Sequence, residues 1–526
     1  MATFTDDQGA MEISNMKING VENNGYTAAD DVSQNGTMKE TISEKALEAG
    51  GTVGLNRTMG YRQGVALMVG LILGSGIFLS PGLIAKHSNS HGMIIAIWLS
   101  AGCLAMMGSL CYCELASIFK LAGSNYVNVQ KIYGNVPGFL CAWTTCLVID
   151  PSSIAAIGMT IGLYLAKPFY ATDEDAQSMQ KILAACVILI AYTINCISVK
   201  CSSRVQSVFV VAQVSSVFFV IVLGMWQLGK GHTENFHDMF NTTTGNGTED
   251  SGSVIHVGLA LFSALWSYDG WSQMSNAVEE MKNVERNLIL TISTAFPFVI
   301  LCYTLVNVSL LSRLNRKQMG ASEAVGVEFV KAALGMKAAY AMMTIVGLSA
   351  YGTLNGTLFA CPRLTLAAAR KGHMPSFFAL INKKTLSPIP ATTLTATLAL
   401  LMLAPSANDL SVLILLFSQA QWILYSASFL GVIVMRIRKP DLERPFKVFI
   451  GIPILVFIVS ATLVIIPFFE KPKLSCGLFG FIILGIPVYF LFVHFKPRFP
   501  TECVNSLTQA LEKHCGMVPC RPEHCS

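Results

Sequence analysis

Apolar segments of about 20 residues, separated by polar loops, recur along the chain from residue 61 to residue 495. A helix of that length crosses the ~30 Å hydrocarbon core of a lipid bilayer, so the pattern predicts about twelve membrane spans. The expected spans are residues 62–85, 92–118, 136–165, 181–199, 205–228, 253–277, 287–311, 336–369, 390–406, 409–436, 448–468 and 474–494. The predicted fold class is therefore an all-α polytopic membrane protein.

Polar sequence flanks this region at both ends. Residues 1–58 lack the charged, apolar and cleavage-site pattern of a signal peptide, so we expect a disordered cytosolic N-terminus. Residues 59–497 form the membrane domain, and residues 498–526 form a cytosolic tail. The tail ends in a Cys- and His-rich stretch whose spacing fits no standard zinc site. An unstructured tail is favoured, with palmitoylation of its cysteines as an alternative.

The composition agrees with a membrane protein. Hydrophobic residues make up 53% of the chain and charged residues 13%, whereas about a quarter of the residues in soluble domains are charged. Most of the 15 cysteines are scattered singly through apolar segments, where Cys acts as a small hydrophobic residue. Nothing in the sequence predicts a metal site, a cofactor or a nucleic-acid partner.

Lys and Arg are unequally distributed between alternate loops. The basic loops are residues 200–204, 282–286, 370–384 and 436–447. The opposite loops, at 172–177 and 241–250, carry acidic and uncharged polar residues. Because basic residues favour the cytosolic side, both termini are predicted to be cytosolic. Two glycosylation triplets, at Asn241 and Asn246, fall in a loop predicted to be extracellular.

The first expected span is interrupted by LILGSGIFLSPG, residues 71–82. Gly74 and Gly76 loosen the helix at mid-bilayer, where an unpaired backbone amide costs several kcal/mol. A broken helix presents amides that suit a carboxylate and carbonyls that suit an ammonium group. An α-amino acid carries both groups. The alternative is close helix packing, because Gly70 and Gly74 match a small-residue packing motif.

The sixth expected span has a matching interruption at Asp269-Gly270. Paired interruptions in corresponding spans of two five-span halves point to a transporter binding site, which favours binding over packing for both breaks. A carboxylate at the membrane centre costs about 2.5–3.5 kcal/mol, so Asp269 should face a cavity or a partner. Binding a cationic substrate and pairing with a hydroxyl or an amide both remain open. Asp150, which precedes Pro151 in the third span, raises the same question.

Five motifs, in order, resemble the light chains of the heteromeric amino-acid transporters, within the amino acid–polyamine–organocation superfamily. They are GSGIFLSP (74–81), YDGW…EEMKN (268–283), AARKGHMP (368–375), SPIPA (387–391) and RKPDLERPFKV (438–448). The resemblance runs from about residue 60 to residue 497. It implies a LeuT-like fold with a 5+5 inverted repeat, in which spans one and six are broken. It also implies sodium-independent amino-acid exchange across the plasma membrane.

The resemblance further implies roles for single residues. The amides of Ser75 and Gly76 would hold the substrate carboxylate, and main-chain carbonyls at both breaks would take the α-amino group. Trp266 would be an aromatic gate, Asp269 would serve cationic substrates, and Gln421 would line the side-chain pocket. The expected substrate-binding residues are Ile72, Gly74, Ser75, Gly76, Trp266, Ser267, Asp269, Gly270 and Gln421.

Three departures from the family pattern matter. The loop at 166–180 lacks the cysteine that light chains use to bond a heavy chain, so a covalent heavy chain is not expected and a noncovalent partner remains open. Gln213 stands where a lysine usually replaces a sodium-site charge, which leaves ion coupling open. Asp150 replaces a basic residue, and it would either be a second anionic point for cationic substrates or pair with another group.

Other functions are less favoured. An amino-acid sensor that signals through its polar termini, and a transporter restricted to large neutral or aromatic amino acids, remain alternatives. An enzyme is not expected, because His373 lies in a basic loop without an acidic or nucleophilic companion and is interpreted as structural. A channel is not expected either, because the sequence has no repeated pore loop.

Overall fold

The computed structural model describes residues 59–74, 76–119, 124–166, 173–197, 199–237, 239–240, 254–272, 274, 281–322, 324–385, 387–404, 410–495 and 501–519. The chain divides into two units, Met1–Gly54 and Leu55–Ser526, and every described residue belongs to the second. The predicted disordered N-terminus and the two glycosylation triplets therefore lie outside the described residues.

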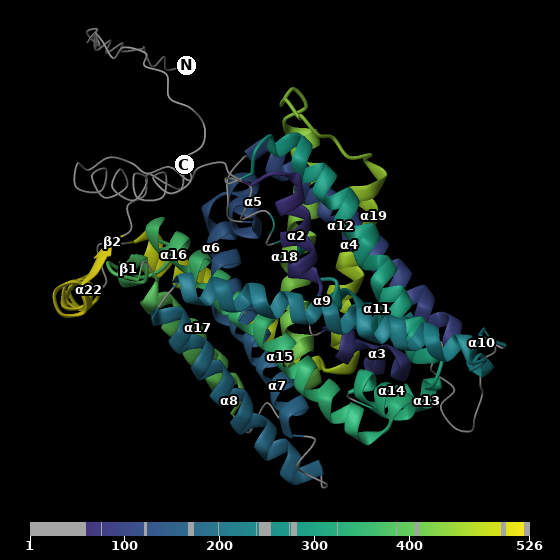
Figure 1. Cartoon of the computed structure of the whole chain (residues 1–526). Helices are drawn as coiled ribbons and strands as arrows, with labels where there is room; N and C mark the ends of the chain where they lie inside the picture. Colours follow the sequence, from purple (N-terminus) through teal and green to yellow (C-terminus); the bar gives the residue numbers. More distant parts are fainter. Residues whose placement is uncertain are drawn as a thin grey trace, which may run out of the picture. The chain divides into compact units, whose positions relative to one another are not determined.

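The second unit is built from helices, as Figure 1 shows. In its described part, eight helical segments are long and apolar enough to cross a membrane. They are α4 (His91–Phe119), α6–η1–α7 (Asn135–Thr144, Thr145–Ile149 and Asp150–Ala166), α8 (Asp173–Ile197), α9 (Val199–Gly229), α12 (Val284–Leu311), α18 (Leu410–Arg438), α19–α20 (Gly451–Ile465 and Pro467–Glu470) and α21–η4 (Pro472–Val488 and Tyr489–His494). The predicted all-α polytopic fold is thereby confirmed.

The other expected spans also contain helices. The first is a bent pair, α2 (Tyr61–Ile72) and α3 (Gly76–His87), which becomes a ninth span if it is counted as one. Two are shorter apolar helices, α11 (Val254–Ser267) and α17 (Ile389–Met402). The last is α15 (Met336–Ala360), which is long but more polar. The inverted repeat that would relate these helices stays a prediction.

Short elements complete the described part. They are α5 (Ser124–Tyr133), α10 (Glu234–His237), α13 (Arg316–Gly320), α14 (Val325–Leu334), α16 (Pro362–Arg370), η3 (Ser376–Ala379), β1 (Leu380–Asn382), α22 (Thr501–Cys515) and β2 (Met517–Pro519).

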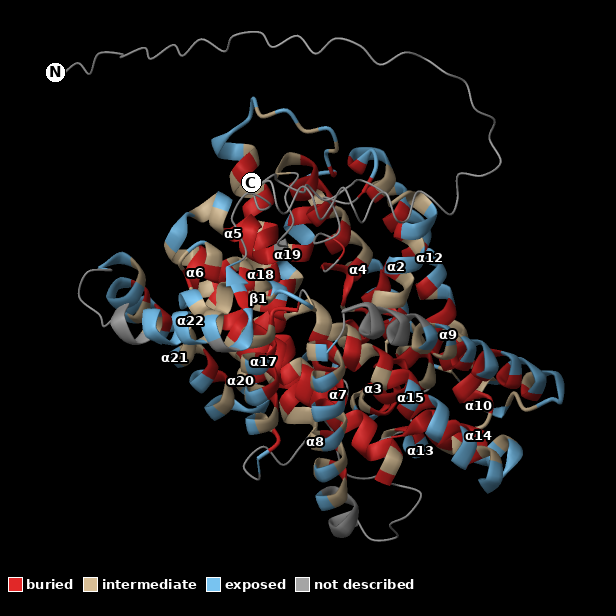
Figure 2. Cartoon of the chain, turned by 60° about the vertical axis from the view of Figure 1, so that its left-hand side comes forward, coloured by how far each residue is buried: buried red, intermediate tan, exposed pale blue. Residues whose placement is uncertain are grey.

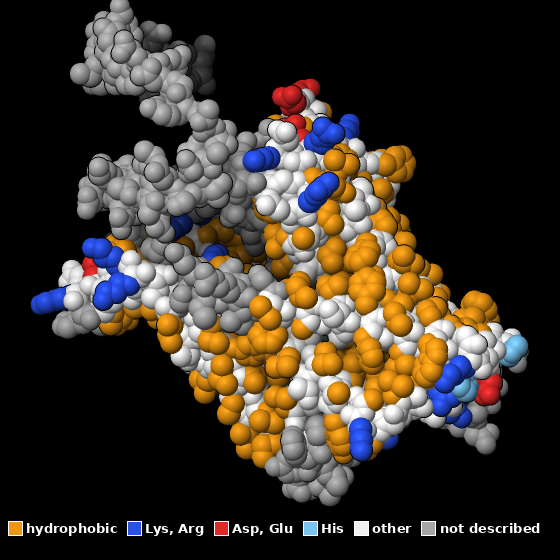
Figure 3. All heavy atoms as spheres, viewed as in Figure 1, with side chains coloured by type: hydrophobic (Ala, Val, Ile, Leu, Met, Phe, Trp, Pro, Cys, Tyr) orange, Lys and Arg blue, Asp and Glu red, His pale blue; other side chains and the backbone are white. Residues whose placement is uncertain are grey.

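Burial differs strongly between helices. In the most apolar window of Asn135–Ala166, 83% of the residues are buried, against 17% in that of Pro472–His494. Figure 2 shows the buried residues concentrated on central helices such as α7 and α18. Apolar side chains also cover much of the face in Figure 3, with Lys and Arg gathered near its ends. An outer surface of this kind suits contact with lipid.

Aromatic rings link the interrupted sixth span to its neighbours. Tyr268, just after α11, lies 4.8 Å from Tyr303 of α12 and 5.8 Å from Trp98 of α4, measured between ring centroids. Trp271 stacks on Tyr425 of α18 at 4.6 Å. Such offset and edge-to-face pairs add about 0.5–1.5 kcal/mol each beyond their buried area. They fix the non-helical turn after α11 against α4, α12 and α18.

A buried ion pair joins α4 to α18. The Glu114 side chain, 1% exposed, accepts hydrogen bonds from Nε and Nη2 of Arg436 at 3.0 and 2.6 Å and from the Val448 amide at 2.9 Å. Arg444 lies 3.9 Å from the same carboxylate. The Arg444 guanidinium also donates to the carbonyls of Met435, Lys439, Pro440 and Leu442. These hydrogen bonds give the turn at RKPDLERPFK a defined structure.

The tail differs from the expectation. Residues 501–519 contain α22 and β2, so an unstructured tail is wrong for this stretch. β2 pairs antiparallel with β1, with Ile381 opposite Val518. Figure 1 shows α22 and both strands close to α16 and α17. The tail sequence alone does not predict this strand, because a strand of three residues forms only where a partner strand supplies its hydrogen bonds.

His373 is buried beside α5. Its Nδ1 lies 2.9 Å from the Tyr126 hydroxyl, and its ring also meets Phe139 edge-on at 5.9 Å. The side chain therefore ties the loop after α16 to α5 and α6, which is a structural role.

Candidate functional site

The first helix break lies between α2 and α3. The two helices are bent by 48° relative to each other. Leu73 still donates its amide to the carbonyl of Val69 at 2.8 Å, and the Gly74 amide turns back to the Ile72 carbonyl at 2.7 Å. Ser75 lies outside the described residues. The predicted interruption of the first span is therefore present at Gly74.

The second break follows Ser267, the last residue of α11. The chain turns through Tyr268, Asp269 and Gly270, and the Asp269 amide donates to the Trp266 carbonyl at 3.2 Å. Gly270 has a φ of 101°, and a Cβ there would lie 2.5 Å from the Leu71 carbonyl oxygen. Only glycine fits this turn, because other residues strain at positive φ and a side chain would strike the first span.

The two breaks touch each other. A Cβ on Gly76 would lie 2.9 Å from the Ser267 Cα, and the Ser267 hydroxyl donates to the Ser80 hydroxyl at 2.6 Å. The close approach explains the glycine at position 76. Ile72, Gly74, Gly76, Ser267 and Gly270, all expected in the substrate site, therefore lie at the junction of the two breaks.

Tyr303 of α12 joins the breaks, and it was not among the residues predicted from the sequence. Its hydroxyl lies 2.8 Å from the carbonyl oxygen of Ile72 and 3.0 Å from that of Ser267. Both carbonyls end a helix segment, where helical hydrogen bonding stops, and the Ile72 carbonyl also accepts the Gly74 amide. A tyrosine inside an apolar span was the available signal, because a buried tyrosine hydroxyl needs a polar partner.

Asp269 has a partner on α18. The Tyr425 hydroxyl donates to Oδ1 of Asp269 at 2.5 Å, and the Ser272 hydroxyl lies 3.0 Å from the same tyrosine oxygen. The sequence left two interpretations of Asp269 open, namely binding of a cationic substrate and pairing with a hydroxyl or an amide. The hydrogen bond from Tyr425 provides the hydroxyl partner of the second interpretation. A carboxylate accepts several hydrogen bonds through its two oxygens, so Tyr425 does not exhaust its capacity.

A small cavity adjoins the second break. Trp266 and Asp269 line it from the end of α11, and Ser418, Gln421 and Tyr425 line it from α18. The structure thus brings three expected residues, Trp266, Asp269 and Gln421, to one cavity. It holds an anionic group, an amide and hydroxyls among aromatic rings, a mixture that suits a small polar ligand with an organic side chain.

Asp150 and Gln213 lie away from this cavity. Asp150 follows a π-helical segment, Thr145–Ile149, and its side chain is buried against the thiol of Cys361. Among the described residues, Asp150 Oδ2 and Gln213 Nε2 have no hydrogen-bond partner. π-Helical segments are frequent at functional sites, but neither residue lines the cavity at Asp269. Their proposed coupling roles stay predictions.

The amino acid permease family model matches residues 59–492, which is most of the chain and all of its broken helices. The chain belongs to the amino acid permease family. It is therefore a multi-pass membrane transporter for amino acids.

Named relatives match about nine tenths of the chain. The chain is 35% identical over 492 residues to the human b(0,+)-type amino acid transporter 1, covering 92% of this chain and 98% of the relative. It is 33% identical to the mouse large neutral amino acids transporter small subunit 2, with 90% and 88% covered. Identity to the human cystine/glutamate transporter is 32%, with 89% and 92% covered. The predicted resemblance to this group of amino-acid transporters is confirmed.

Proposed function

We propose that this transporter exchanges neutral and cationic L-amino acids across the plasma membrane without sodium. The observation that carries the proposal is the junction of two broken helices next to a cavity that contains the carboxylate of Asp269. The amides that follow the first break, at Ser75 and Gly76, would hold the substrate carboxylate. The carbonyls of Ile72 and Trp266 would take the α-amino group.

Asp269 would distinguish the substrate classes. Its Oδ1 accepts the hydrogen bond of Tyr425, which leaves Oδ2 for a guanidinium or ammonium group of the substrate side chain. A neutral side chain would instead contact the aromatic rings of Trp266 and Trp271, with Gln421 at the edge of the cavity. One site would then accept both classes.

Transport would follow from movement of the broken helices. Trp266 would close over the bound amino acid, and the spans that contain the breaks would rock against the other helices. Net exchange would require a second amino acid for the return step. No chemical change to the substrate is involved.

The proposal also covers the orientation of the chain in the membrane and its association with a heavy chain. Both termini would be cytosolic, because the basic loops gather on one side. A heavy chain, if one binds, would associate without a disulfide, because the loop at 166–180 contains no cysteine.

A transporter restricted to large neutral amino acids is the second candidate. The hydrogen bond from Tyr425 favours it, because this bond gives Asp269 a partner without any substrate. The name of the mouse large neutral amino acids transporter small subunit 2 also points this way. The two candidates differ in whether replacing Asp269 affects arginine selectively.

Uptake of radiolabelled arginine and leucine by the purified chain in liposomes tests the proposal, with and without sodium and internal amino acid. Asp269→Asn is compared with wild type, and Asp441→Asn, on an exposed cytosolic turn, is the matched control. We expect sodium-independent uptake of both substrates that needs internal amino acid, with arginine uptake lost in Asp269→Asn alone. Uptake of leucine only, unchanged in the variant, would establish the second candidate. Binding without uptake would indicate a sensor.

A further inference from the structure

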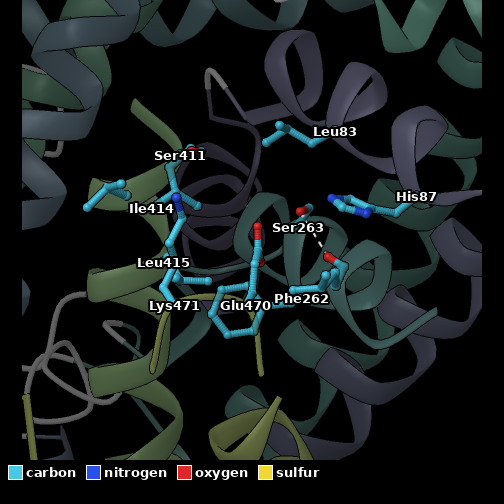
Figure 4. A pocket seen from close by; sticks show the side chains of 11 residues that line it. Leu83, His87, Phe262, Ser263, Ser411, Ile414, Leu415, Glu470 and Lys471 are labelled. Atoms are coloured by element: carbon cyan, nitrogen blue, oxygen red, sulfur yellow. Dashed lines mark hydrogen bonds between the residues drawn. The ribbon is translucent and has the colours of Figure 1, made fainter. Parts of the chain in front are cut away.

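A second cavity, open to solvent, lies at the ends of the helices that are predicted to face the extracellular side. Leu83 and His87 line it from the end of α3, Phe262 and Ser263 from α11, and Ser411 from the start of α18. Figure 4 shows these side chains around a common space.

This outer cavity is aligned with the inner one along two shared helices. On α11, Ser263 of the outer cavity comes three residues before Trp266 of the inner cavity, roughly 4.5 Å along the axis. On α18, Ser411 comes seven residues before Ser418, roughly 10 Å along the axis. A molecule in the outer cavity is therefore about two helical turns or less from the Trp266 gate.

The outer cavity contains one charge of each sign. Glu470 and Lys471, between α20 and α21, both line it, and in Figure 4 the Glu470 side chain reaches between His87 and Phe262, near Ser263. Among the residues that the structure describes, neither side chain has a hydrogen-bond or ion-pair partner. The carboxylate and the ammonium are therefore both available to a ligand.

The rest of the lining is mainly apolar. Leu83, Leu259, Phe262, Ile414 and Leu415 line the same cavity, whereas Glu470 and Lys471 are exposed residues. An α-amino acid matches this lining, because it carries an ammonium, a carboxylate and a side chain on one carbon. A simple anion or cation would leave one of the two charges and the apolar wall unused.

We propose that the outer cavity is an acceptor site where an amino acid binds before it passes Trp266, with its α-ammonium on Glu470 and its α-carboxylate on Lys471. The inference rests on the proposed function, because it takes the ligand class from there. It also distinguishes the role of the outer cavity from the role of Asp269. Glu470 and Lys471 act on groups that all amino acids share, whereas Asp269 acts on a cationic side chain only.

The test measures the KM for leucine and arginine on each face of the membrane, in cells that express the full chain, by uptake and by efflux from preloaded cells. For Glu470→Gln and Lys471→Gln we expect an external KM raised at least about threefold for both substrates, which is an effect of about 0.7 kcal/mol. The internal KM and the maximal rate should not change. Glu328→Gln, an exposed glutamate paired with Lys331 on α14, is the matched control.

Three outcomes would overturn the proposal. They are an unchanged external KM in both variants, an equal change on both faces, and an external effect that disappears at high ionic strength. The last outcome would mean that the charges only steer substrate by long-range attraction. Because the internal KM comes from the same cells, a variant that fails to fold is recognised by loss of transport in both directions.

A binding measurement separates this inference from the proposed function. Ser411→Cys places a thiol in the outer cavity and leaves Glu470 and Lys471 in place. An impermeant maleimide should label it, and leucine and arginine should both slow the labelling. Protection without uptake would support the acceptor site while overturning exchange. Uptake without protection would overturn the acceptor site alone.

Discussion

Tyr425 donates a hydrogen bond of 2.5 Å to the carboxylate of Asp269 and thereby ties the second helix break to α18. The bond is charge-assisted, and it holds one carboxylate oxygen at a defined place in the inner cavity. The position of this carboxylate therefore depends on a residue 156 positions away in sequence.

We predict that Tyr425→Phe lowers kcat/KM for arginine about tenfold, because hydrogen bonds to charged groups contribute about 1.5–3 kcal/mol. Leucine should change less than about twofold, because its side chain makes no use of the carboxylate. The measurement is the uptake kinetics of both substrates in Tyr425→Phe, with Asp269→Asn measured in parallel. Equal losses for arginine and leucine would show that the bond maintains only the fold.

Tyr303→Phe should reduce exchange of both substrates about tenfold. The variant removes the donor shared by the carbonyls of Ile72 and Ser267. The Ile72 carbonyl keeps the Gly74 amide, but the Ser267 carbonyl loses its hydroxyl partner, and an unsatisfied buried group costs about 1–3 kcal/mol. Tyr192→Phe is the control, because this variant removes only an exposed hydrogen bond, between the hydroxyls of Tyr192 and Thr393. A loss confined to arginine would contradict the role of Tyr303 at the common junction.

Gly270→Ala should destabilise the folded transporter. A residue with a side chain at φ 101° is strained by about 1–3 kcal/mol, and the added Cβ meets the Leu71 carbonyl. We expect a lower melting temperature in detergent and little transport. Gly477→Ala on α21 is the comparison, because nothing lies within 4 Å of a Cβ at that position. Equal stability of the two variants would be inconsistent with the strained turn.

Glu114→Gln should lower stability by about 3–5 kcal/mol, because it leaves the buried guanidinium of Arg436 without its carboxylate. Replacing the exposed Glu328, which pairs with Lys331, should cost no more than about 1 kcal/mol. Thermal unfolding of the purified variants compares the two. A Glu114→Gln, Arg436→Gln double variant should recover part of the loss, and a purely additive result would show that the pair does not interact.

Ending the chain after Cys515 should lower the melting temperature, because this truncation removes β2 and exposes β1. Ending it after Pro519 is the matched control, which keeps β2 and removes only residues outside the described part. We expect the longer variant to behave like the full chain. Identical melting curves for both truncations would show that the strand pair contributes nothing to stability.

Hydropathy and glycine placement predicted the helices and both breaks, because span length and backbone freedom are local properties. They did not predict Tyr303 or Tyr425, since Tyr303 joins two segments 231 and 36 residues away, Tyr425 finds its partner 156 residues away, and each looks in sequence like any membrane aromatic. Glu114 was also missed, although an acidic residue within a span is itself a signal. β2 was missed because its short strand depends on a distant partner.

The pairing of β1 with β2 has a consequence for synthesis. Leu380–Asn382 leave the ribosome long before Met517–Pro519 are made, so this loop stays open until the chain is nearly complete. Its unpaired strand edge is a feature that cellular quality control can recognise. A product shortened by a late nonsense codon would keep that edge exposed permanently, even with every membrane helix already in place.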